Sequence, residues 1–302
     1  MEYTIENGII KVTVSTHGAE IQSIVGKHLG NEYIWQADPA VWGRHAPVLF
    51  PIVGRMKNDS YTYKGKKYEM HQHGFARDME FALEEQTEDK LTFLLTDNEE
   101  TRKIYPFKFE FRVSYELLNN MVKESFKVTN KSEGEMIFGV GGHPGFALPV
   151  NDQVKKDDFY LQVTPAKPRV QVPLEGAYLN WKKRSLAPTG TLITIDDELF
   201  KNDAMVLVMR RPNNKFSIRT DTSRFHVNVR TDSAPYVGVW SQYPNCGNYV
   251  CIEPWWGIAD LTDADGDLEH KQGMNKLEAG EEFEASFRMS FHSQGEPNEL
   301  KA

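Results

Sequence analysis

The clearest structural signal in this 302-residue chain is the stretch Phe109-Glu-Phe-Arg-Val-Ser-Tyr-Glu-Leu-Leu-Asn-Asn-Met-Val-Lys-Glu-Ser-Phe-Lys-Val128. Apolar side chains occupy every second position from 109 to 117, with polar side chains between them, and a second extended run follows from Val122. Period-two alternation is typical of half-buried β-strands. The Asn119-Asn120 pair between the two runs indicates a two-residue turn. The stretch therefore predicts an antiparallel hairpin.

The same alternation recurs along the chain. A second hairpin is predicted over Tyr61–Met70, with its turn at Lys64-Gly65. Further strands are expected at Ile9–Val14, Leu91–Thr96, Phe159–Val163, Met205–Met209, Phe216–Arg219, Phe225–Arg230, Tyr236–Trp240 and Phe283–Phe291. Short helical turns are expected only at Pro39–Gly43 and Asp196–Lys201. So many strands with so few helices predict an all-β fold, a large antiparallel β-sandwich, formed as one domain over residues 1–293 with a polar tail over 294–302.

Composition and charge exclude several classes of protein. Lys and Arg number 35 against 43 Asp and Glu, which gives a net charge of −8, and no basic run suggests a nucleic-acid partner. The two cysteines, Cys246 and Cys251, cannot form a disulfide framework, so we expect reduced thiols in a cytoplasmic protein. No signal peptide is recognisable, and no apolar run approaches the ~18 residues of a membrane helix. We therefore expect no membrane partner.

Four short polar segments hold the candidate functional residues. They are Pro51–Arg55, His71–Arg77, Gly141–Phe146 and Cys251–Gly257. Each segment places an ionisable side chain beside glycine, proline or an aromatic residue. Such neighbours are typical of a cleft in which a few polar groups are held rigidly around a ring-shaped ligand. The segments supply two imidazoles, one carboxylate and two guanidiniums, but no cysteine nucleophile. This set of groups indicates proton transfer on a polar molecule that is either uncharged or phosphorylated.

Glu253 and His143 are the strongest candidates for proton transfer. Glu253 follows an apolar strand and precedes Trp255 and Trp256, so partial desolvation would raise its pKa and its basicity. Trp255 could cover the apolar C–H face of a sugar ring. The alternative is that Glu253 ends a core strand and points to solvent. Glycines around His143 permit close approach of a ligand, although a histidine held in a tight turn would look the same.

The remaining candidates have weaker signals. On a strand, His71 and His73 would share a face and could chelate a metal, but no third ligand is evident, so a hydrogen-bonding role for His73 is favoured and no metal is expected. Arg55 and Arg77 follow turn-like segments and suit hydroxyl pairs, carboxylates or phosphates. The Asp263–Asp267 loop departs from a calcium loop in its glycine position and its twelfth residue, and is interpreted as an acidic surface loop.

Taken together, these motifs resemble the aldose 1-epimerase (mutarotase) family. They are His73–Arg77, Gly141–Phe146 and Glu253–Asp260, together with Gly54-Arg55. The resemblance covers nearly the whole chain, from about residue 9 to residue 291. It implies a β-sandwich of the supersandwich type, which agrees with the strand pattern. It also implies an isomerase that opens and closes an aldohexose ring by acid–base catalysis, with no cofactor.

The resemblance also implies roles for individual residues. Glu253 would be the catalytic base and His143 the general acid on the ring oxygen. His73 would be the second histidine, hydrogen-bonding near the ring oxygen. Arg55 would bind sugar hydroxyls or orient Glu253, and Asp203 is the best match to the family's sugar-binding Asp.

Departures from the family pattern concern the substrate. Galactose mutarotases carry Gly-Gly where this chain has Gly74-Phe75, and Thr-Gln where it has Pro254-Trp255. The chain is more similar to the branch found with lactose-operon genes and to hexose-6-phosphate epimerases, in which arginines matching Arg55 and Arg77 bind the phosphate. A hexose-6-phosphate 1-epimerase and a non-catalytic sugar-binding protein on the same fold are therefore the alternatives. The oligomeric state is open, with a homodimer as one option.

Overall fold

The predicted central hairpin is present. The computed structural model describes residues 1–244 and 247–292, so Cys246 and the predicted tail over 294–302 lie outside the described residues. Strand β10 (Phe109–Leu118) pairs antiparallel with β11 (Met121–Asn130), and the register places Leu118 opposite Met121. Asn119 in the turn has a φ of 59°, a left-handed conformation that Asn adopts more readily than most residues.

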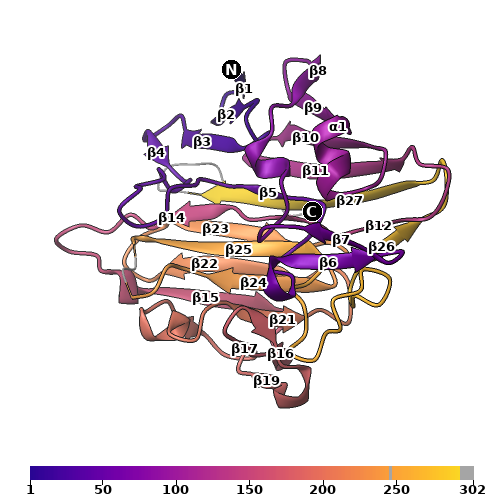
Figure 1. Ribbon diagram of the computed structural model, residues 1–302. Helices are drawn as coiled ribbons and strands as arrows, with labels where there is room; N and C mark the ends of the chain where they lie inside the picture. Colours follow the sequence, from indigo (N-terminus) through magenta and orange to yellow (C-terminus); the bar gives the residue numbers. More distant parts are fainter. Residues whose placement is uncertain (245–246, 293–302) are drawn as a thin grey trace.

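Two large antiparallel sheets make up most of the molecule (Figure 1). Within the described residues the larger sheet has nine strands in the order β20 (Ile193–Thr194), β15 (Phe159–Thr164), β22 (Lys215–Thr220), β23 (His226–Arg230), β27 (Glu282–His292), β11, β10, β9 (Lys90–Thr96) and β8 (Ala82–Gln86). The second has the order β19 (Ser185–Ala187), β16 (Arg169–Val172), β21 (Met205–Val208), β24 (Tyr236–Trp240), β25 (Tyr249–Trp256), β13 (Val140–Gly142) and β5 (Val48–Leu49), with β14 (Gly145–Ala147) also on β25. The fold is therefore the predicted large antiparallel β-sandwich.

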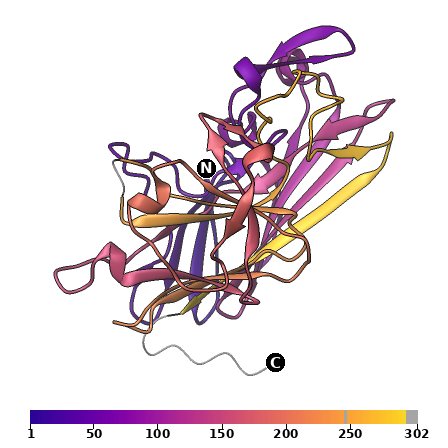
Figure 2. The ribbon, with the colours of Figure 1, turned by 90° about the horizontal axis from the view of Figure 1, so that it is seen from below.

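Smaller elements surround the two sheets. A four-stranded sheet consists of β1 (Glu2–Glu6), β2 (Ile10–Ser15), β3 (Ile21–Gly26) and β4 (Asn31–Glu32). Three two-stranded sheets are β6 (Ser60–Tyr63) with β7 (Lys66–Glu69), β12 (Met136–Phe138) with β26 (Asn275–Leu277), and β17 (Leu174–Glu175) with β18 (Tyr178–Leu179). The β6–β7 hairpin is the second predicted hairpin, and it projects at the top of Figure 2 in purple.

The core lies between the two large sheets. Phe126 of β11 contacts Trp256 of β25 at a ring separation of 6.1 Å, and Phe111 of β10 stacks on Phe50 at 4.4 Å. Every residue of β25 is buried. Successive side chains of a strand point to opposite faces, so Trp256 faces the core while Glu253 and Trp255 face the other side of the sheet. Burial of both faces is what allows a strand of this sheet to line an internal site.

Helical structure is sparse, as predicted, but its positions differ in part. Pro39–Gly43 forms a hydrogen-bonded turn instead of a helix, with the Trp42 amide donating to the Asp38 carbonyl. The 3₁₀-helix η5 (Glu198–Phe200) lies within the segment predicted near 196–201. The short helix α1 (Glu99–Ile104) was not predicted. It begins at Asn98, whose side chain accepts hydrogen bonds from two amides of the first turn.

The other 3₁₀-helices are η1 (Lys57–Asp59), η2 (Ala76–Asp78), η3 (Lys156–Asp158) and η4 (Trp181–Lys183). Among the described residues, no helix combines the length and the apolar character that crossing a membrane requires.

Candidate active site

All seven residues predicted to form a site line one cavity. Its volume is about 470 Å³. It lies on the face of β25 that is turned away from the sandwich core, and its walls include Glu253, His143, His73, Arg55, Arg77, Asp203 and Trp255. These residues come from segments far apart in the sequence, and β25 pairs with both β13 and β24 to bring them together.

Glu253 is held in the middle of β25, opposite Gly238 of β24. It is 1% exposed, so the alternative that it points to solvent is wrong. Trp255 fills the neighbouring space because two strands carry glycine beside it. A Cβ atom on Gly238 would lie 2.5 Å from the Trp255 ring, and one on Gly141 would lie 2.8 Å from it. The cross-strand glycines therefore make room for an indole next to the carboxyl.

The environment of Glu253 favours its protonated form. Burial raises the pKa of this carboxyl well above its usual range, and the nearby Asp203 carboxylate acts in the same direction. The indole N–H of Trp255 opposes the rise in the pKa of Glu253 to a smaller extent. A buried carboxyl with a raised pKa is a candidate for proton transfer near neutral pH.

His143 contacts Glu253 directly. The distance from His143 Nε2 to Glu253 Oε2 is 3.1 Å. Trp42 stacks on the imidazole at a ring separation of 5.1 Å, and Trp240 meets it edge-on at 5.6 Å. Burial lowers the pKa of His143 to about 3, and the charge of Arg77 also lowers it. Two indole rings therefore hold the His143 imidazole in place, with Nε2 close to the Glu253 carboxyl.

Burial disfavours a charge on either group alone. A carboxylate at Glu253 beside a neutral His143, or an imidazolium at His143 beside a protonated Glu253, would be an uncompensated buried charge. The neutral pair and the ion pair contain the same number of protons and differ only in where one proton resides. Burial of both groups favours the neutral pair while no ligand lies between them.

His73 lies in a turn and not on a strand. Its φ is 67°, and Gly74 follows with a φ of 74°. The expectation that His71 and His73 share a strand face is therefore wrong. The Gly54 amide donates to His73 Nδ1 at 3.1 Å, and the His73 amide donates back to the Gly54 carbonyl at 2.8 Å.

These contacts fix the state of the His73 ring. Because Nδ1 accepts a hydrogen bond, Nε2 carries the proton of the neutral ring. Burial lowers the pKa of His73 well below its usual value, with the neighbouring His143 and Arg77 adding to the effect. The two imidazoles are perpendicular, with ring centres 5.5 Å apart. His73 is thus a neutral hydrogen-bond donor at the wall of the cavity.

The two predicted arginines line the cavity near His73. Arg77 donates from Nη2 to the carbonyl of Gln72 at 2.7 Å, and Arg55 Nη2 lies 3.5 Å from the Gln72 side-chain oxygen. Burial lowers the pKa of Arg77 to about 10, and Arg44 contributes in the same direction. The Nε atoms of Arg55 and Arg77 are buried and make no hydrogen bond to any described residue.

Asp203 is positioned by a left-handed residue conformation, with a φ of 68°. The Ala204 amide donates to its carboxylate at 2.8 Å, and burial raises the pKa of Asp203 while this bond and Trp240 oppose the rise. The charge of Asp203 contributes to the raised pKa of Glu253. Both carboxyl groups line the cavity.

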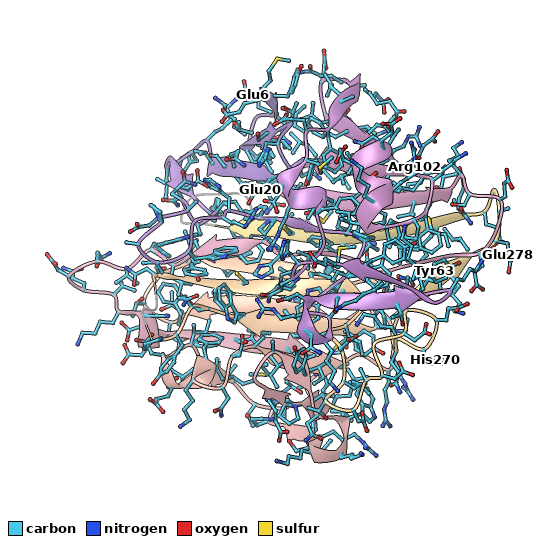
Figure 3. All side chains as sticks on the ribbon, in the orientation of Figure 1. Glu6, Glu20, Tyr63, Arg102, His270 and Glu278 are labelled. Atoms are coloured by element: carbon cyan, nitrogen blue, oxygen red, sulfur yellow. The ribbon has the colours of Figure 1, made fainter. Side chains whose placement is uncertain are left out.

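Sequence patterns missed several cavity residues. They include Trp42, Gln72, Phe200, Lys201, Trp240 and Tyr243. Trp42 lies in an irregular loop, and nothing in the surrounding residues indicates where that loop folds. Glu20, labelled in Figure 3, accepts hydrogen bonds from the amides of His45 and Ala46, both at 2.8 Å, and so anchors the loop.

A buried ion pair joins Asp260 to Lys271. Lys271 Nζ contacts Asp260 Oδ1 at 2.6 Å, and the Lys57 amide donates to Asp260 Oδ2 at 2.8 Å. The Asp260 amide donates to the Arg55 carbonyl at 3.0 Å. Gly54 packs so closely on Ala259 that an added Cβ would lie 2.5 Å from its methyl group. These contacts join the segment that carries Arg55 to the segment that follows β25.

Comparison with known proteins agrees with the fold. Residues 1–290 match the family model for aldose 1-epimerase. The plasmid-encoded protein LacX of Lactococcus lactis is 31% identical over 287 residues, which cover 92% of this chain and 95% of that protein. A solved galactose mutarotase related enzyme from Lactobacillus acidophilus is 61% identical, with a TM-score of 0.97 and coverage of 99% of this chain and 100% of that one.

A galactose mutarotase-like protein from Lactobacillus casei is 29% identical, with a TM-score of 0.90, and the match covers 97% of this chain and 100% of that one. The family match spans nearly the whole chain. The alignments with these relatives also cover more than nine-tenths of it. The chain belongs to the aldose 1-epimerase family.

Proposed function

We propose that the chain is an aldose 1-epimerase that interconverts the α and β anomers of an aldohexose. The observation that carries the proposal is the contact of 3.1 Å between His143 Nε2 and Glu253 Oε2 inside the cavity. A sugar-binding protein needs hydrogen bonds and aromatic faces, but it has no need of a buried acid–base pair that shares one proton.

The mechanism follows from that shared proton. A sugar that enters between the two groups separates them, with Glu253 facing the C1 hydroxyl and His143 facing the ring oxygen. In the ion-pair form, Glu253 takes the hydroxyl proton while His143 gives its proton to the ring oxygen, and the C1–O5 bond breaks to give the open-chain aldehyde. Rotation about C1–C2 and closure on the other face, with the roles reversed, yields the other anomer. Each positioned proton transfer contributes about 10²–10⁴-fold to the rate.

Other cavity residues support this reaction by binding. His73 Nε2, which lies 3.3 Å from the Gln72 side-chain nitrogen, can donate to a sugar oxygen, and the Asp203 carboxylate can accept bonds from hydroxyl groups. Trp240 and Trp255 offer apolar surface for the C–H face of the ring, whereas Trp42 is stacked against both His143 and Tyr249. The arrangement follows the usual design of small-molecule sites, in which a few polar groups orient a ligand between apolar walls.

Polarimetry of freshly dissolved α-D-glucose and α-D-galactose tests the proposal. We expect the protein to accelerate mutarotation and His143→Ala to remove the acceleration. A protein that binds these sugars but leaves their mutarotation at the spontaneous rate would support the non-catalytic sugar-binding alternative and overturn the proposal.

Hexose 6-phosphates are the second candidate substrates. Three cationic side chains, Arg55, Arg77 and Lys201, line the cavity. The Nε atoms of Arg55 and Arg77 form ion pairs with Asp59 at 3.3 Å and Asp78 at 3.8 Å that lack hydrogen-bond geometry. Planar guanidinium groups of this kind suit a phosphate. This candidate predicts a lower KM for glucose 6-phosphate than for glucose, and Arg77→Ala should remove that preference. Arg219→Ala, on an exposed position outside the cavity, is the matched control and should leave it unchanged.

A further inference from the structure

We propose that His143, Cys251 and Glu253 form a binding site for a borderline-soft divalent cation of the Zn²⁺ type at the wall of the cavity, and that such an ion blocks proton transfer to and from the sugar. The inhibition rests on the proposed function, whereas the binding of the ion does not. Cys251 is buried and free, and it has no part in the proposed reaction.

Two neighbouring strands, β14 and β25, bring His143, Cys251 and Glu253 together. Cys251 and Glu253 are two residues apart on β25, so their side chains lie on the same face of the strand. Strand β14 pairs with β25 through Gly145 and Cys251, which brings the preceding turn with His143 over the same face. One ligand atom from each residue, an imidazole nitrogen, a thiol sulfur and a carboxylate oxygen, lies within 4.8 Å of the other two.

These distances are close to those of an occupied site. A tetrahedral ion with ligand distances of about 2.0–2.3 Å holds its ligands about 3.3–3.8 Å apart. The His143 and Glu253 atoms are 3.1 Å apart, and the widest separation in the group needs to close by only about 1 Å. A change of rotamer at Cys251 or Glu253 would supply that adjustment.

The ligand types select the class of cation. A thiolate and an imidazole suit Zn²⁺, Co²⁺ or Cd²⁺, whereas Mg²⁺ and Ca²⁺ prefer oxygen ligands. A divalent cation with the Cys251 thiolate and the Glu253 carboxylate is neutral overall, which reduces the cost of burying the charges. His143 and Glu253 both line the cavity, so the fourth position faces the space where water or a sugar hydroxyl would lie. Three protein ligands with one open position is the arrangement of many zinc sites.

Binding of the ion and proton transfer exclude each other. A bound ion occupies the lone pairs of His143 and Glu253 that would exchange protons with the sugar. A molecule that holds the ion therefore cannot turn over.

Cobalt absorption tests the binding without reference to activity. Co²⁺ added to the metal-free 302-residue chain should bind at one site and give a thiolate-to-cobalt charge-transfer band in the near ultraviolet. Cys251→Ser should abolish the band, and Cys246→Ser, which changes the chain's other cysteine, is the matched control and should keep it. A band that persists in Cys251→Ser, or tight binding to wild type without a band, would overturn the proposal.

Inhibition supplies the second readout. Zn²⁺ should slow mutarotation by the wild-type protein, and Cys251→Ser should weaken this inhibition by at least about 10-fold while it retains catalysis in the absence of metal. Equal inhibition of both proteins would overturn the proposed site. If the protein proves inactive towards every sugar, the cobalt band still decides the question of binding, so failure of the proposed function and failure of the metal site are distinguishable.

Discussion

Glu253 and Asp260 are two buried carboxyl groups close together in the sequence, and their surroundings are opposite. Both oxygens of Asp260 are bonded, one to Lys271 and one to the Lys57 amide. Glu253 faces a cavity and meets the imidazole of His143 at 3.1 Å, and no Lys or Arg within the described residues forms an ion pair with it. The contacts of Asp260 occupy both of its oxygens with protein donors, whereas Glu253 is open to a ligand in the cavity. We therefore interpret Asp260 as a structural group and Glu253 as a candidate catalytic group.

Glu253→Gln should show the largest effect on turnover and almost none on folding. The variant keeps the shape of the side chain but cannot accept a proton, so kcat should fall by at least about 10²–10⁴-fold. Replacing a carboxyl that burial already favours as neutral costs little stability. Anomer exchange by NMR and thermal unfolding measure the two effects. A variant with near wild-type turnover would show that Glu253 is not the base.

Asp260→Asn should show the reverse pattern. It leaves the Lys271 ammonium buried and without its partner, which costs about 3–5 kcal/mol in unfolding free energy. Turnover per folded molecule should fall far less than in Glu253→Gln. Denaturant unfolding measures the loss. Asp265→Asn, which removes an exposed partner of His270, is the matched control and should leave stability unchanged.

The pH dependence of stability should report the buried His143. Its folded-state pKa of about 3 lies below the ordinary value of 6.5, so the unfolded chain binds a proton that the folded protein does not. The stability that this group contributes is present above pH 6.5 and is lost as the pH falls towards 3. The expected slope is about 1.4 kcal/mol per pH unit.

Denaturant unfolding of wild type and His143→Gln between pH 4 and pH 7 tests this expectation, with a flatter profile predicted for the variant. Parallel profiles would contradict the burial of a neutral imidazole at this position. His73, whose pKa is also lowered by burial, contributes a similar slope that remains in the variant.

Gly238→Ala should show the smallest effect. It tests whether the missing side chain of the glycine opposite Glu253 makes room for Trp255. The added methyl group would lie 2.5 Å from the Trp255 ring, and overpacking of this kind costs about 1–3 kcal/mol. The displaced indole should also lower kcat, because Trp255 lies next to the reacting carboxyl. Gly134→Ala is the matched control, since nothing lies within 4 Å of a Cβ atom there. Equal stability and activity in both variants would contradict the packing argument.

The sequence predicted the strands and the site more fully than the loops. Alternation of polar and apolar residues reports the local geometry of a strand, so Tyr236–Trp240 agrees with β24 at both ends. Very short strands such as β5 offer too few residues for a pattern. Trp42 and Lys271 were missed because their positions depend on contacts between distant segments. A single domain over residues 1–293 stays a prediction.

A double-variant experiment tests most directly the claim that Glu253 and His143 act as one proton-sharing pair. Anomer exchange rates would be measured for wild type, Glu253→Gln, His143→Gln and the combined variant. Residues that act as a unit are strongly non-additive, so the combined variant should be no more than a few-fold slower than the slower single variant. Losses that multiply in the combined variant would show two independent contributions and contradict the account.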